Sequence, residues 1–273
     1  NGEPEMIGKV LSTSPVIKKI TFTGSTEVGK LLMKNSSSTV KNISLELGGN
    51  APFIVFSDAD LDAALNGFMM AKFRNAGQTC ISANRLFVHK SVSNIFTSKL
   101  LERLKKLKVG DGMNGSDIGP LISNEALKKV TNHVSDAKKN GAKILFGGNK
   151  HKLGGLFFEP TLISNVKKNM KVFQKENFGP IIPLIEFDND DEVINMSNET
   201  NYGLAAYFYT KNSTTIWKNL NNLDYGMFGI NSGKISTYLN PFGGLKESGI
   251  GREGSLQCLD PFLETKFALW NYD

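Results

Sequence analysis

Segments with strand-like and helix-like apolar spacing alternate along most of the chain, and this alternation restricts the fold more than any other feature. The runs 52–56 and 181–187 are almost continuously apolar, which is typical of strands buried on both faces of a sheet. The segments 61–73 and 92–108 carry apolar residues at helical spacing instead. We therefore predict an α/β fold in which helices flank a largely parallel sheet. Further strands are expected at 16–23, 42–47, 85–89, 142–146, 203–210 and 227–231, and further helices at 124–140, near 190 and from 213.

Size and charge set the class of protein. With 273 residues, 40% of them hydrophobic, the chain fits one large domain, or one domain and part of a second. No apolar run has the length of a transmembrane helix. The net charge of +6 is modest, and the densest basic cluster, 103–108, alternates with leucines at helical spacing. This favours a solvated helix face over a nucleic-acid site, so we expect neither nucleic acid nor a membrane as partner.

Cysteine usage points to a reducing compartment. Cys80 and Cys258 are too few for a disulfide framework, so we expect an intracellular protein. Cys80 follows a Gly-containing turn in Lys72–Cys80, where backbone amides can point at whatever the sulfur attacks. A buried cysteine is often only a small core residue, and that alternative stays open for this thiol taken alone. A nucleophilic thiol needs a partner that moves protons, and the best candidate is Glu46, next to a Gly-Gly turn.

The segment Gly24–Lys30 satisfies the spacing G-x-x-x-x-G-K but does not predict a P-loop. The next residue is Leu31, where a P-loop carries Ser or Thr to hold magnesium. A strand, a glycine turn and a helix N-terminus still form an anion site, because free amides and the helix dipole point the same way. The residues alone therefore indicate a phosphate or ribose contact and nothing more specific.

Other types of site find little support. No G-x-S-x-G is present, and none of the three histidines sits in a Cys or Ser motif, so a hydrolase is disfavoured. No spacing resembles a set of metal ligands, and we expect no metal. Near the end, 262–270 resembles a strand without an obvious partner in the chain, which suggests pairing with another subunit.

Six motifs in order across almost the whole chain resemble the aldehyde dehydrogenase superfamily, and most closely its succinate-semialdehyde dehydrogenases. One contains Glu46 and another ends at Cys80. The six segments are 22–29, 45–52, 73–80, 176–180, 201–205 and 241–249.

The resemblance implies a chemistry for these residues. Cys80 is expected to add to an aldehyde and give a thiohemiacetal, which passes hydride to NAD or NADP and leaves a thioester on sulfur. Glu46 is expected to act as general base for the thiol, for the hydrolytic water, or for both. The backbone amide of Cys80 would form half of an oxyanion hole. The residues expected to contact the cofactor are Gly24, Ser25, Leu47, Glu176 and Phe178.

The resemblance also implies a substrate. Arg74 and Ser236 resemble a pair that binds the distal carboxylate of succinic semialdehyde, and Phe242 is placed to line the substrate tunnel. We expect Arg74 to be buried, since a buried arginine without a carboxylate partner discriminates against neutral aldehydes. Two alternatives remain: another carboxylated aldehyde such as glutarate semialdehyde, or a structural salt bridge at Arg74.

Full-length chains of the family are nearly twice as long, and the missing part is N-terminal. We expect residues 1–47 to be the end of a Rossmann-like cofactor domain, 48–250 to be the catalytic domain, and 251–273 to hold a return segment and an oligomerisation strand. The preference between NAD and NADP would be decided in the missing part. A homo-oligomer, dimer or tetramer, in the cytoplasm or the mitochondrial matrix is expected. The alternative is a catalytically silent homologue that acts by association.

Overall fold

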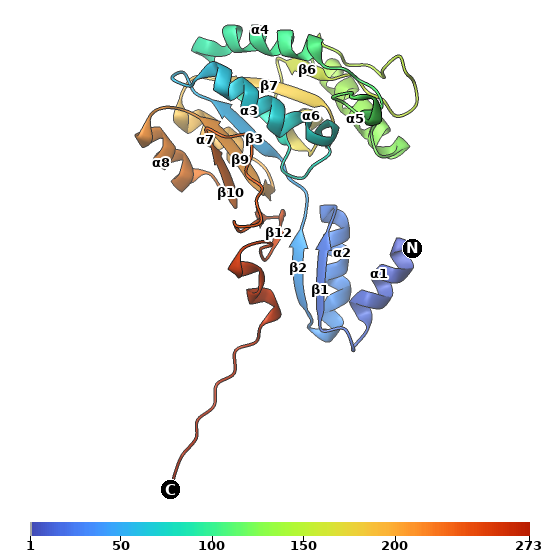
Figure 1. The fold of residues 1–273 in the computed structure, drawn as a ribbon, viewed down its shortest axis with the longest axis vertical. Helices are drawn as coiled ribbons and strands as arrows, with labels where there is room; N and C mark the ends of the chain where they lie inside the picture. The colour runs from blue at the N-terminus through green and yellow to red at the C-terminus, as the bar shows by residue number, and fades with distance from the viewer. Residues whose placement is uncertain (1) are drawn as a thin grey trace.

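A seven-stranded sheet forms the centre of the larger part of the molecule (Figure 1). The structure is a computed structural model that describes residues 2–273. Neighbouring strands follow the order β10-β9-β3-β4-β7-β6-β5, and every pair is parallel except β6 with β5. The predicted α/β fold with a largely parallel sheet is confirmed. The strands are β3 (Ala51–Val55), β4 (Ala83–His89), β5 (Lys143–Phe146), β6 (Thr161–Ser164), β7 (Ile181–Phe187), β9 (Ala205–Tyr209) and β10 (Met227–Ile230).

Helices cover both faces of this sheet, because successive residues of a strand point to opposite sides. Phe53 and Val55 pack in one apolar cluster with α3 and α4, whereas Ile54 and Phe56 pack in another with α7 and α8. A third cluster joins α5 and α6 to β6 and β7. The run 52–56 is thus buried from both sides, as its continuous apolar character predicts. The helices are α3 (Leu61–Phe73), α4 (Lys90–Lys106), α5 (Asn124–Lys139), α6 (Lys171–Gln174), α7 (Asp190–Asn198) and α8 (Ser213–Asn222).

A smaller, three-stranded sheet lies below the large one in Figure 1 and leads to Glu46. Its strands β1 (Lys19–Thr23) and β2 (Asn42–Glu46) are parallel and are joined by α2 (Thr26–Ser36). The third strand, β12 (Gly249–Ile250), comes from the other end of the chain and pairs antiparallel with β2. A two-stranded ribbon of β8 (Tyr202–Gly203) and β11 (Leu245–Lys246) precedes it. The glycine-rich segment after 243 therefore closes the smaller sheet.

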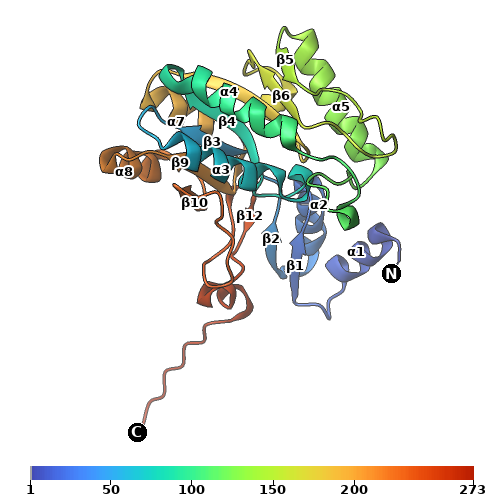
Figure 2. The same cartoon turned by 45° about the horizontal axis from the view of Figure 1, so that its top comes forward.

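One helix was not predicted from the sequence, and the strand predicted in the tail finds no partner strand among residues 2–273. Helix α1 (Pro4–Thr13) packs against α2 although no helix is expected before the first strand. Most of its residues are exposed, so its apolar pattern marks no core-facing stripe. The tail 262–270 forms no strand within the chain, although Glu264 near its start accepts a hydrogen bond from Asn42 of β2 at 2.8 Å. The expected pairing with another subunit stays a prediction. From residue 265 on, the chain is extended and exposed and runs away from the rest (Figures 1 and 2).

Two further expectations concern a membrane-spanning helix and the basic cluster 103–108. Across residues 2–273, no helix combines the length and apolar character needed to span a membrane. The basic cluster 103–108 begins in the last turn of α4, where Lys105 pairs with Glu102 one turn away at 2.7 Å. Arg103 donates to the side chain of Asn66 at 2.8 Å. These contacts fit a solvated helix face.

Candidate active site

Cys80 lies on a tight loop between α3 and β4. After Phe73 the chain reverses through Asn75, Ala76 and Gly77, whose φ angles are 52°, 56° and 78°. Glycine is required at 77, because a Cβ atom there would lie 2.4 Å from the carbonyl oxygen of Gly179. The loop leaves Cys80 half-buried beside the main apolar cluster. Burial raises the pKa of the thiol, and the backbone N–H groups of Cys80 and Ile81 oppose that shift only in part.

Glu46 ends β2 and is only 4% exposed. Gly249 of β12 pairs with it, and a Cβ atom at Gly243 would lie 2.9 Å from its Oε1. Its Oε2 has no hydrogen-bond partner among residues 2–273. Burial, with a smaller effect of Glu253, raises the pKa of Glu46 to about 8, although Arg252 opposes the shift. A carboxyl group that titrates near neutral pH can both accept and release a proton there.

The thiol of Cys80 is affected by the charges of two nearby carboxyl groups, Glu46 and Glu176. Burial raises the pKa of the Cys80 thiol to about 11, and the charges of Glu176 and Glu46 add to this shift. Burial also raises the pKa of Glu176. Such a thiol is almost fully protonated at neutral pH, so a neighbouring group must take its proton before it can attack.

The glycine pair after Leu47 brings these groups together. A Cβ atom at Gly49 would lie 2.3 Å from the carbonyl oxygen of Cys80, and one at Gly48 would lie 3.2 Å from Oε2 of Glu176. The N–H of Gly49 also donates to Oε1 of Glu176 at 2.9 Å. The turn is therefore glycine because two other segments pack directly on its backbone.

The residues predicted to bind the cofactor surround the N-terminus of α2. Gly24 donates its N–H to the carbonyl oxygen of Glu46 at 3.0 Å, and Ser25 caps the helix through its hydroxyl. Leu47 is buried against Gly29 of the same helix, where a Cβ atom would lie 2.6 Å from its side chain. The glycine turn, the cap and Leu47 thus form one continuous surface next to Glu46.

Glu176 and Phe178 approach this surface from the loop between α6 and β7. Phe178 is half-buried and has a positive φ of 49°. A cavity of about 560 Å³ lies alongside, with Thr26, Thr200 and Tyr202 in its wall. A helix N-terminus, a glycine turn and a buried carboxylate fit the diphosphate and ribose of a dinucleotide.

Arg74 and Ser236, predicted to hold a distal carboxylate, line one pocket of about 290 Å³. Thr79 and Ile81, the neighbours of Cys80 in sequence, line it too. Lys234 also lines this pocket, whereas no acidic side chain of residues 2–273 lines it. Phe242 is not among the lining residues of this pocket; it packs, half-buried, on the same apolar cluster as Cys80.

Arg74 is exposed, which corrects the prediction that it is buried. Helix α3 ends just before it, so its side chain leaves the core while that of Lys72 remains inside. Lys72 is 0% exposed, its Nζ has no hydrogen-bond partner within residues 2–273, and burial lowers its pKa to about 7. Arg74 forms no ion pair with any described residue, so the structural salt bridge lacks support. Water weakens the selectivity of an exposed arginine.

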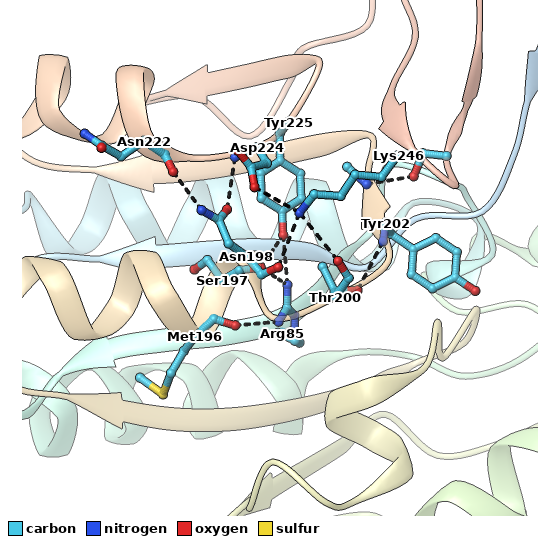
Figure 3. A network of polar contacts seen from close by, with 12 residues as sticks. Arg85, Met196, Ser197, Asn198, Thr200, Tyr202, Asn222, Asp224, Tyr225 and Lys246 are labelled. Carbon is cyan, nitrogen blue, oxygen red and sulfur yellow. Dashed lines mark hydrogen bonds and ion pairs between the residues drawn. The ribbon is translucent and has the colours of Figure 1, made fainter.

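The buried polar groups behind the site were missed from the sequence. Arg85 is fully buried and forms no ion pair with a carboxylate among residues 2–273, and the centres of two phenylalanine rings lie within 5.5 Å of its guanidinium. The only signal was a polar pair, Asn84-Arg85, at the start of an otherwise apolar strand. Figure 3 shows the end of α7 and the side chain of Tyr225 gathered around this guanidinium, which donates to the carbonyl oxygens of Met196 and Ser197 and to the hydroxyl of Tyr225. It also donates to the carbonyl oxygen of Asn50.

Comparison with known proteins agrees with this geometry. The model of the "Aldehyde dehydrogenase family" matches residues 1–268. A Sinorhizobium fredii protein named "Probable succinate-semialdehyde dehydrogenase [NADP(+)]" is 53% identical over 97% of this chain and 54% of its own length. The glutarate-semialdehyde dehydrogenase of Pseudomonas aeruginosa is 49% identical over 97% of this chain and 55% of its own length. The chain thus spans about half the length of the curated relatives that it matches.

Solved structures give the same result for the fold. The crystal structure of succinate-semialdehyde dehydrogenase from Burkholderia pseudomallei superposes with a TM-score of 0.94 at 49% identity, over 96% of this chain and 55% of that one. A match of this extent covers both sheets and the loops that hold Cys80, Glu46 and Glu176. The chain belongs to the aldehyde dehydrogenase family.

Proposed function

We propose that this protein oxidises succinic semialdehyde to succinate with NAD⁺ or NADP⁺. One observation carries the proposal. The thiol of Cys80 is electrostatically coupled to Glu46, whose pKa is near neutral, and its sequence neighbours line a pocket that contains the cations Arg74 and Lys234. The names of the relatives support the same reaction.

Cys80 supplies the nucleophile. Glu46 takes the thiol proton as the sulfur bonds to the aldehyde carbon, and the backbone N–H of Cys80 stabilises the oxygen that becomes negative. A bound NAD(P)⁺ would supply the hydride acceptor that converts the Cys80 adduct to the oxidation level of an acid, at the surface formed by the five residues described next. Glu46 then releases the first proton to solvent and removes a proton from water, which attacks the thioester carbon. The C–S bond breaks, succinate leaves, and the departing sulfur is reprotonated to the free thiol. The balance is one aldehyde, one NAD(P)⁺ and one water to one carboxylate, one NAD(P)H and two protons.

Five residues are proposed to hold the cofactor. Gly24 and Ser25, at the N-terminus of α2, would face the diphosphate, where free amides and the helix dipole favour negative charge. Leu47 and Phe178 would pack beside the nicotinamide, and Glu176 would bind the ribose next to it. The closeness of Glu176 to Gly48 and Gly49 supports this arrangement.

The substrate class rests on charge. Two cations, Arg74 and Lys234, and the hydroxyl of Ser236 line the pocket beside Cys80, with Phe242 on the apolar side of the thiol. These three side chains would bind a negatively charged group but would not distinguish aldehydes by chain length, so glutarate semialdehyde is the second candidate substrate. The name of the Pseudomonas aeruginosa relative favours that candidate as well.

The test follows NADH and NADPH formation with succinic semialdehyde, glutarate semialdehyde and neutral propanal. Arg74→Ala should raise the KM for both anionic aldehydes about two- to fivefold, the worth of one exposed ion pair, and leave propanal unchanged. Arg103→Ala, which removes an exposed arginine of α4 that does not line the pocket, is the matched control and should change no KM. Equal loss for all three aldehydes in Arg74→Ala would contradict the proposed anchor.

A silent homologue is the alternative, since the chain spans about half of its relatives. Absence of turnover, with Cys80 alkylated and its rate dependent on Glu46, would favour that reading for the chain as it stands. Cys258 serves as the internal reference thiol.

We also propose the assembly and the compartment. The exposed tail at 262–270 would pair with a second copy in a homodimer or tetramer, and the two free cysteines favour a reducing compartment, either the cytoplasm or the mitochondrial matrix. We further propose that residues 1–47, 48–250 and 251–273 are the cofactor-domain end, the catalytic domain and the tail. Strand β12, at the end of the proposed catalytic range, completes the sheet of the preceding segment.

A further inference from the structure

Asn84, a residue that lies behind the site, makes hydrogen bonds to both chain neighbours of Glu176. Its Nδ2 donates to the carbonyl oxygen of Lys175 at 3.0 Å, and its Oδ1 accepts from the N–H of Asn177 at 2.9 Å. Asn84 is 4% exposed, so water does not compete for these bonds. The backbone on both sides of Glu176 is therefore held by one side chain.

The same amide group reaches the glycine turn. Nδ2 of Asn84 also donates to Oδ1 of Asn50 at 2.6 Å. Asn50 is fully buried, and its own Nδ2 donates to the carbonyl oxygen of Phe173 at 3.0 Å. From the other side, Nε and Nη2 of Arg85 donate to the Asn50 carbonyl oxygen at 3.2 and 2.9 Å. Asn50 is thus fixed through both its side chain and its backbone.

These contacts close a ring. Asn50 directly follows Gly49, whose N–H donates to Oε1 of Glu176 at 2.9 Å. Glu176 in turn sits between the two residues that Asn84 holds. Starting from Asn84, the ring runs through the Glu176 segment, across the Gly49 hydrogen bond, and back through Asn50.

We propose that Asn84 is the positioning residue of Glu176: it fixes the carboxylate on the Gly49 amide, in the place where that carboxylate would meet the nicotinamide ribose. The functional part of this inference rests on the proposed function, whereas the positioning itself does not. Only an amide fits, since the position needs one acceptor for an N–H and donors for two carbonyl oxygens. An aspartate would direct an oxygen at the oxygens of Lys175 and Asn50.

The ring extends one step further, to His133 of α5. Nδ1 of His133 lies 2.8 Å from Oδ1 of Asn177, whose Nδ2 donates to the carbonyl oxygen of Val172 at 3.2 Å. Oδ1 of Asn177 is therefore an acceptor, and Nδ1 of His133 carries a proton. This bond holds the far side of the Glu176 loop and leaves the Asn84 contacts as the link to the glycine turn.

The first test measures hydrogen exchange of backbone amides by NMR on this chain. In Asn84→Ala, the Gly49 amide should exchange at least tenfold faster and reach the rate seen in Glu176→Ala. The Gly24 amide, bonded to the Glu46 carbonyl oxygen, should keep its wild-type rate. Asn219→Ala is the matched control, since Asn219 is another fully buried asparagine, on α8, and should leave the Gly49 amide unchanged. Wild-type exchange at Gly49 in Asn84→Ala would overturn the proposal.

Asn84→Ser, which keeps a hydroxyl at the site, serves if Asn84→Ala does not fold. It should give intermediate exchange at Gly49, and a wild-type rate would again count against the positioning role.

The second test uses turnover and addresses the ribose role. Asn84→Ala should raise the KM for NAD(P)⁺ about tenfold, with the KM for succinic semialdehyde and the alkylation rate of Cys80 within about twofold of wild type. Faster exchange at Gly49 without a change in the KM for NAD(P)⁺ would leave the positioning intact and refute the assignment of Glu176 to the ribose. The two failures are thus distinguishable.

Discussion

At the scale of single residues, the pKa values around Cys80 describe a thiol that is inactive until its proton is removed. With a pKa of about 11, the thiol is ionised in only about one molecule in ten thousand at pH 7. Two buried carboxyl groups cause part of this shift, and one of them, Glu46, has a pKa of about 8. The same carboxylate therefore opposes the thiolate electrostatically and is the group able to take its proton.

Glu46→Gln separates these two effects. Removing the negative charge lowers the pKa of Cys80, so alkylation by iodoacetamide at pH 9 should become about two- to threefold faster. Turnover should fall at least 100-fold, the usual worth of a general base. In Glu46→Gln the alkylation rate should rise about tenfold between pH 8 and pH 9, because both pH values lie below the raised pKa of the thiol. The wild-type rate should rise less, since Glu46 gains its opposing charge over the same range.

The two rates would be measured on the same preparations, with Cys258 as internal standard for general thiol access. Slower alkylation in Glu46→Gln would contradict the electrostatic account and would mean that Glu46 already activates the thiol in the free protein.

At the scale of elements, a two-residue strand fixes the position of Glu46. Gly249 of β12 pairs with Glu46, and the N–H of Leu47 donates to the carbonyl oxygen of Ser248 at 2.8 Å. Gly249 has a φ of 148°, and a Cβ atom there would lie 2.0 Å from the carbonyl oxygen of Leu45. Any side chain at 249 would push β12 away from β2, and with it the wall around the carboxylate.

Gly249→Ala should lower the free energy of unfolding by about 1–3 kcal/mol, the usual cost of overpacking, because a backbone oxygen cannot move aside as a side chain can. Denaturant unfolding followed by circular dichroism measures this change. Gly112→Ala is the control, since a Cβ atom there meets nothing within 4 Å, and its stability should stay within about 0.5 kcal/mol of wild type. Equal stability of the two variants would show that the β12 contact is not tight.

At the scale of the whole molecule, the end of the tail, residues 265–273, forms no hydrogen bond or ion pair with the rest of the described chain. Phe267, Leu269 and Trp270 are 90%, 85% and 78% exposed, and the residues after 264 contact only one another. An extended segment with exposed aromatic residues is suited to pairing with a sheet edge of a second copy. The proposed oligomer follows from this surface.

Deletion of residues 265–273 should convert the oligomer to a monomer in light scattering. Its melting temperature at low protein concentration should remain that of the intact monomer, because no hydrogen bond or packing contact with the body of the molecule is removed. A truncated chain that keeps the mass of the full one would refute the role of the tail.

Much of the architecture was predictable because it depends on local periodicity. The expected strands at 52–56, 85–89 and 181–187 and the helices at 61–73 and 124–140 agree with the structure within about two residues. Helix α1 was missed because most of its residues are exposed, so it shows no core-facing stripe that periodicity detects. The strand expected at 262–270 stays a prediction, since it was assigned to pairing with another subunit and strand formation requires that partner edge.

The sequence by itself determined the order of elements and the family motifs, and it led to the proposal that Cys80 and Glu46, both beside glycine turns, act together. These features depend on residue type and short-range spacing. Only the tertiary structure decided which charges are buried: the end of α3 places Lys72 in the core and Arg74 at the pocket mouth, two residues apart. It also decided that Asn84 holds the Glu176 segment and that β12 closes on β2. These contacts join residues 90 to 200 positions apart, and no local pattern encodes the distance between them.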